Sequence, residues 1–115
     1  MKGNIIVDKS FVFAVGIVKL YQKLVSENKE FVLSKQLLRC GTSIGANIEE
    51  AVGGISKRDF IAKLQISYKE ARETKYWLRL MIETDIISKA EAESLISDCE
   101  EIIRIIVAII KTSKK

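Results

Sequence analysis

The middle of the chain is a glycine-bearing segment that reads Arg39-Cys40-Gly41-Thr42-Ser43-Ile44-Gly45-Ala46-Asn47-Ile48-Glu49-Glu50-Ala51. Its apolar residues recur at three- and four-residue spacing, which is the pattern of one face of an α-helix. A glycine inside a helix costs about 1 kcal/mol relative to alanine. Gly41 and Gly45 lie one turn apart, so we expect a neighbouring helix to approach closely there. Gly53 and Gly54 then end the helix.

Ser43 and Asn47 form a polar pair on one side of this segment, also one turn apart. A polar pair beside an apolar stripe usually satisfies backbone groups or fixes the register between helices. Direct contact with a ligand is the alternative role. We favour the structural role and keep the functional one open.

Helical periodicity extends over most of the 115 residues, interrupted by short polar or glycine-bearing breaks. A chain of this length suffices for one domain, and helices joined by short connections pack against their sequence neighbours. The pattern predicts an all-α fold, an antiparallel up-down-up-down four-helix bundle in one domain over residues 1–115. The predicted helices cover about residues 8–26, 34–52, 56–84 and 88–111.

Two serines predict where the third and fourth helices begin. Ser88 and Glu91 form a Ser-x-x-Glu capping box, in which each side chain accepts a hydrogen bond from the other residue's backbone N–H. Ser56 and Asp59 have the same spacing, with Asp in place of Glu.

The composition restricts the chemistry. The chain contains no histidine, no proline and two cysteines. Without histidine there is no histidine general base, no Ser–His or Cys–His nucleophile pair and no histidine metal ligand. We therefore predict a protein that is not an enzyme and has no cofactor or metal. No segment has the length and hydropathy of a membrane span or the pattern of a signal peptide, so we expect a cytoplasmic protein with reduced Cys40 and Cys99.

Two carboxylates on the third helix raise an enzymatic alternative. Glu70 and Glu73 could hold Mg²⁺ in a nucleotide hydrolase, but such a site needs a facing acidic pair. Antiparallel pairing about the glycine turn places Glu49 and Glu50 more than two turns away. The same pairing brings Arg39 near Glu70 and Lys35 near Glu73, so we interpret Glu70 and Glu73 as ion-pair partners across the hairpin.

Positive charge is concentrated in the first two thirds of the chain. The net charge is +4, but residues 1–79 carry 14 basic and 8 acidic side chains, whereas residues 80–115 carry 5 and 7. A basic stripe interleaved with tyrosine can hold phosphates and stack unpaired bases. An ordinary solvated face, partly neutralised by neighbouring acids, is the alternative. The candidate nucleic-acid-binding residues are Lys69, Arg72, Lys75, Tyr76 and Arg79 on the third helix, and Lys19 and Lys23 on the first.

The first and last helices carry apolar residues on more than one face. A bundle buries about one face of each helix. A second apolar face indicates either an unusually large core or contact between subunits, and we favour a homo-oligomer.

The chain also resembles a known family. The residues that carry the similarity are Lys35-Gln36-Leu37-Leu38-Arg39, then Ser43-Ile44-Gly45-Ala46-Asn47-Ile48-Glu49-Glu50-Ala51, and downstream Ser56-Lys57-Arg58-Asp59-Phe60-Ile61, Leu64 and Glu73-Thr74-Lys75-Tyr76-Trp77-Leu78. They are similar to the signature of four-helix bundle proteins also called the 23S ribosomal RNA intervening-sequence protein family. The similarity covers about residues 33–82. The signature residues, to which we assign a structural role, are Arg39, Gly41, Ser43, Gly45, Asn47, Glu50 and Glu73.

A similar fold occurs in the accessory variability determinant of diversity-generating retroelements, a pentameric basic barrel that binds nucleic acid and a reverse transcriptase. The resemblance implies a four-helix protomer, a ring-like homopentamer and a nucleic-acid role. It does not imply an enzyme. The leading hypothesis is a non-enzymatic homopentamer that binds RNA or DNA, with an adaptor for a polymerase-type or other partner protein as the alternative.

Overall fold

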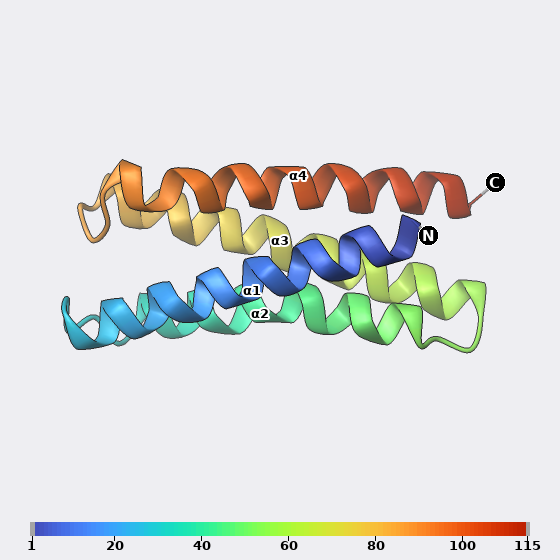
Figure 1. Cartoon of the computed structure of the whole chain (residues 1–115), viewed down its shortest axis with the longest axis horizontal. Helices are drawn as coiled ribbons and strands as arrows, with labels where there is room; N and C mark the ends of the chain where they lie inside the picture. The colour runs from blue at the N-terminus through green and yellow to red at the C-terminus, as the bar shows by residue number, and fades with distance from the viewer. Residues whose placement is uncertain (1, 115) are drawn as a thin grey trace.

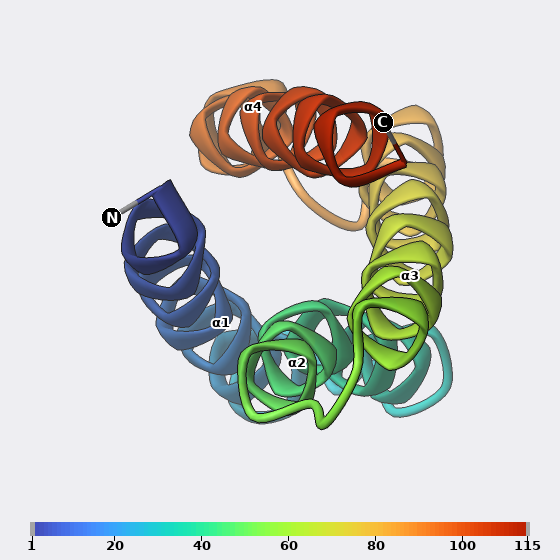
Figure 2. The same cartoon turned by 90° about the vertical axis from the view of Figure 1, so that its right-hand side faces the viewer.

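The computed structural model describes residues 2–114, and these residues form four helices. Successive helices run in opposite directions along a bundle of 45 × 20 × 20 Å (Figure 1). Seen along that axis, the helices follow one another around the core in chain order (Figure 2). The expected all-α fold is confirmed. The helices are α1 (Lys2–Ser26), α2 (Leu33–Val52), α3 (Lys57–Glu83) and α4 (Lys89–Ser113).

Serine caps begin α3 and α4 as the sequence predicts. The Ser56 hydroxyl accepts a hydrogen bond from the Asp59 backbone N–H at 3.0 Å. At the start of α4, Ser88 and Glu91 form both hydrogen bonds of a capping box, at 3.1 and 3.2 Å. Each cap satisfies a backbone donor that has no partner within its own helix.

The first helix starts earlier than the sequence predicts, whereas α2 begins at Leu33, next to the predicted residue 34. Helix α1 begins at Lys2 and not near residue 8, and Ile6 on this added turn is buried in the core. Helix α2 is capped by a residue outside it. The Glu30 carboxylate accepts hydrogen bonds from the backbone N–H groups of Val32, Leu33 and Ser34, at 3.1, 3.1 and 2.7 Å.

The two glycines of the central segment lie where α1 crosses α2, as expected. A Cβ atom on Gly41 would lie 2.8 Å from Cγ2 of Ile17, and one on Gly45 would lie 3.3 Å from the Ser10 carbonyl oxygen. The polar pair has a local role, because Asn47 Nδ2 donates a hydrogen bond to the Ser43 carbonyl oxygen at 2.8 Å. This contact agrees with the structural role that we favoured for the pair.

The buried face of each helix contributes aliphatic side chains to one continuous core that runs the length of the bundle. Between residues 2 and 114, no helix is both long and apolar enough to cross a membrane. The fully buried members of the core include Ile17, Leu24, Leu37, Ile44, Leu78, Met81 and Ile106.

Candidate nucleic-acid interface

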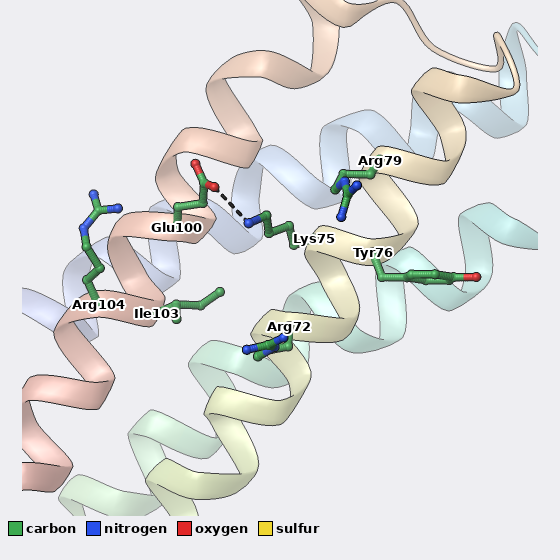
Figure 3. A pocket seen from close by; sticks show the side chains of 7 residues that line it. All are labelled: Arg72, Lys75, Tyr76, Arg79, Glu100, Ile103 and Arg104. Atoms are coloured by element: carbon green, nitrogen blue, oxygen red, sulfur yellow. Dashed lines mark ion pairs between the residues drawn. The ribbon is translucent and has the colours of Figure 1, made fainter.

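A pocket of about 410 Å³ lies between α3 and α4, and we call it the α3–α4 pocket. Four cationic side chains and one carboxylate line the pocket, so its net charge is positive. Figure 3 shows that side chains from both helices extend into or border it. The lining residues are Arg72, Lys75, Tyr76 and Arg79 of α3, and Glu100, Ile103 and Arg104 of α4.

The helical repeat of α3 places its cations on one side. Ala71, Thr74 and Leu78 are buried against the core, whereas Arg72 and Arg79 are exposed. Residues three and four apart share a helix face, so the buried and the cationic residues form two parallel stripes. The cationic stripe therefore lies outside the core, along the border with α4.

Most of the charge in the α3–α4 pocket is uncompensated. Lys75 Nζ lies 2.9 Å from Glu100 Oε2, and this hydrogen bond lowers the pKa of Glu100. No carboxylate of the described residues lies within 4.0 Å of the guanidinium of Arg72, Arg79 or Arg104. Guanidinium groups present several N–H donors in a plane and match the oxygens of a phosphate. The pocket is thus suited to an anion with several acceptor oxygens.

Two aromatic residues beside the cations have different environments. The Tyr76 side chain is 57% exposed and its ring projects away from α4 (Figure 3). Trp77 is half-buried, meets Tyr76 edge to face with ring centroids 5.2 Å apart, and donates a hydrogen bond from Nε1 to Glu73 at 3.0 Å. Trp77 is therefore a packing residue, whereas Tyr76 offers an exposed ring next to cations.

The structure brings together four of the seven residues that the sequence suggested for nucleic-acid binding. Lys69 and Lys19 are exposed but do not line the α3–α4 pocket. Lys23 forms an ion pair with Glu91 at 2.7 Å. Sequence reasoning missed Arg104, because it lies in the acidic last third of the chain. Antiparallel pairing of the last two helices is the signal that could have found it.

The acidic residues of α3 face a different partner. Arg39 of α2 forms ion pairs with Glu70, at 3.1 Å, and with Glu73. The first pair confirms the expected link across the hairpin, whereas Glu73 pairs with Arg39 and not with Lys35 as the sequence suggested. Glu50 pairs with Lys63 at 2.8 Å. Among residues 2–114, no group of three or more acidic or cysteine side chains is arranged to hold a metal ion.

The two cysteines are free thiols inside the core. Burial raises the pKa of Cys40 to about 11 and that of Cys99 to about 12. A thiol attacks or binds a metal as the thiolate, so neither side chain is in a reactive form near neutral pH.

Both the sequence and the four-helix fold are similar to those of known proteins. Residues 2–108 match the family described as 23S rRNA-intervening sequence protein. The chain is 56% identical in sequence to a protein from Bacteroides thetaiotaomicron with a known crystal structure. That protein is described as one with unknown function from the S23 ribosomal protein family. That similarity covers 96% of this chain and 99% of the other, with a TM-score of 0.94. No protein of curated function matches. The chain belongs to the 23S rRNA-intervening sequence protein family.

Proposed function

We propose that this protein is a non-enzymatic, homo-oligomeric protein that binds RNA or DNA by holding backbone phosphates in the α3–α4 pocket. The observation that carries the proposal is that four cationic side chains and one carboxylate line a single pocket between two helices. Phosphate contacts from Lys and Arg supply most of the affinity for nucleic acid that does not depend on base sequence. The exposed Tyr76 adds a surface on which an unpaired base can stack.

Fluorescence anisotropy across a salt series tests this binding. The probes are a labelled hairpin RNA and a labelled single-stranded DNA of about 20 nucleotides, a length that exceeds the site of a small binding domain. We expect binding at about 50 mM salt, with affinity that falls steeply as salt rises because counterions are released. No binding by either probe, or affinity that does not change with salt, contradicts the proposal.

Charge reversal at the pocket shows whether the interface lies there. The double variant Arg72→Glu/Arg79→Glu is expected to weaken binding by at least about tenfold and to reduce the salt slope by about two contacts. Both side chains are exposed, so the fold should survive. The control is Lys35→Glu/Lys89→Glu, which changes the net charge equally at exposed positions outside the pocket. Equal losses in the two variants contradict a localised interface.

The oligomeric part of the proposal is supported by α1. This helix exposes five large apolar side chains, with Phe11 at 66% and Val12 at 68% exposure, together with Ile5, Val15 and Val18. The described residues of α4 expose no large apolar side chain, because the additional isoleucines of this helix pack against the core, so the second apolar face expected on the last helix is absent. An apolar groove of about 250 Å³ between α1 and α2 adjoins Phe11. A second copy would cover this face, and α1 lies across the bundle from α3 (Figure 2).

Light scattering after size exclusion tests this association. We expect the wild type to elute at a multiple of the 13.0 kDa chain mass, five chains by the family resemblance. Phe11→Glu/Val15→Glu should reduce the mass to that of smaller species, since two buried charges oppose the contact. Phe31→Glu/Val32→Glu, at exposed positions in the α1–α2 loop, is the matched control. A monomeric wild type contradicts the oligomer.

A further inference from the structure

Glu100 is the one acidic side chain among the residues lining the α3–α4 pocket. Its Oε2 atom accepts a hydrogen bond from Lys75 Nζ at 2.9 Å, across the space between the two helices (Figure 3). Both side chains are partly exposed, at 34% for Lys75 and 42% for Glu100. Glu100 therefore neutralises one of the four cations of the pocket, and this ion pair is accessible to solvent.

We propose that Glu100 is a built-in competitor of the nucleic acid, which holds Lys75 in the free protein and yields it to a backbone phosphate on binding. The inference rests on the proposed function, because it concerns the same pocket. A solvent-exposed Lys–Glu pair is weak and is screened by salt, so a phosphate that also binds guanidinium groups can displace the carboxylate. Arg72, Arg79 and Arg104 supply those groups.

The exchange limits the affinity of the site. In the wild type, a phosphate can bind Lys75 only by breaking the Lys75–Glu100 ion pair. The carboxylate of Glu100 also repels the phosphate. The three guanidinium groups therefore supply most of the attraction for a phosphate. Lys75 adds little to the net free energy of binding. Without the carboxylate, Lys75 becomes a fourth free cation.

The variant Glu100→Gln tests this directly, because glutamine keeps the shape of the side chain and removes its charge. With the hairpin RNA and the single-stranded DNA described above, we expect Glu100→Gln to bind the responding probe about three- to tenfold more tightly at about 0.1 M salt. The salt slope should steepen by roughly 0.7 to 0.9, the value for one additional phosphate contact.

The next residue of α4 provides a matched control. Glu101 is ion-paired with Lys9 of α1, also at 2.9 Å, but it does not line the α3–α4 pocket. Glu101→Gln thus makes the same change in net charge and also releases a lysine from a pair. We expect it to change affinity less than about twofold, because its carboxylate pairs with Lys9 of α1, outside the pocket. An equal gain from both variants overturns the proposal, since the gain would then reflect net charge alone.

A double-mutant cycle separates competition for Lys75 from simple repulsion by Glu100. Lys75→Gln should cost little affinity in the wild type and at least about threefold more in the Glu100→Gln background. An equal cost in both backgrounds overturns the proposal. Circular dichroism of each variant confirms that the helices remain.

The same measurements distinguish the role of Glu100 from nucleic-acid binding itself. If the wild type binds through Arg72 and Arg79, but Glu100→Gln leaves affinity and salt slope unchanged, the competitor role is wrong and the nucleic-acid interface stands. If none of the variants binds either probe, both are wrong.

Discussion

Gly41 shows how a single residue positions the helices of this bundle. Its missing side chain lets Ile17 of α1 lie directly on the backbone of α2, in the fully buried part of the core. The cost of a glycine within a helix was the signal that predicted this contact. The sequence could not show which helix approaches, because that depends on the packing of all four.

Replacing Gly41 with alanine is expected to destabilise the protein by about 1 kcal/mol, although alanine is the better helix former. The added Cβ would lie 2.8 and 2.9 Å from side-chain atoms of Ile17, and overpacking costs about 1–3 kcal/mol against a propensity gain of about 1 kcal/mol. Urea unfolding measures the difference.

Gly53→Ala is the matched control for that experiment. A Cβ atom there meets nothing closer than 3.7 Å, and we expect a change within about 0.5 kcal/mol. If Gly41→Ala is as stable as the wild type, the helices do not pack as closely as described.

At the scale of elements, local signals predicted the helix starts unevenly. The α3 and α4 starts follow from Ser56 and Ser88, because a serine cap and its partner lie three residues apart. The α2 start follows from apolar periodicity to within one residue, but its cap, the carboxylate of Glu30 in the preceding loop, carried no recognisable sequence signal. The early start of α1 was missed as well, because burial of Ile6 and not a capping motif extends it.

The Glu30 cap predicts a pH dependence of stability. Its partial burial opposes the charge, but the hydrogen bonds from the backbone of Ser34, Leu33 and Val32 lower the pKa of Glu30 overall. A carboxylate whose pKa is lower in the folded state stabilises the fold. This contribution is complete at pH values above the pKa of the unfolded chain, about 4.3 for Glu, and is lost as the pH falls through the pKa of the folded state. The cap should therefore be complete at pH 7 and lost in acid.

Glu30→Gln isolates that contribution, since glutamine resembles the protonated acid. We expect a loss of about 0.5–1 kcal/mol at neutral pH that shrinks towards zero at a pH of about 3. Thermal or urea unfolding at both pH values measures it. The exposed Glu27 of the same loop is the control, and Glu27→Gln should show a smaller effect. A loss for Glu30→Gln that is equal at both pH values would exclude the carboxylate cap.

At the scale of the whole molecule, the cationic pocket and the most apolar helix surface lie on different elements. The uncompensated cations lie between α3 and α4, whereas five of the eleven exposed large apolar side chains of the described residues belong to α1. Helix α1 lies across the bundle from α3 (Figure 2). The sequence indicated both features but not their arrangement. Charge counting placed the basic surface before residue 80, yet Arg104 completes the pocket, because antiparallel packing brings α4 beside α3. Lys69 shares the stripe on α3 but lies outside the pocket.

The most direct test of the central claim locates bound nucleic acid on the protein. Ultraviolet cross-linking of the single-stranded DNA, followed by mass spectrometry of the digested protein, identifies the residues next to the bases. We expect Tyr76 and its neighbours in the α3–α4 pocket to carry the cross-links, because the phosphates hold the strand there and the exposed ring receives a base. The Arg72→Glu/Arg79→Glu variant should lose them. Cross-links confined to α1 or α2, unchanged in that variant, would contradict the account.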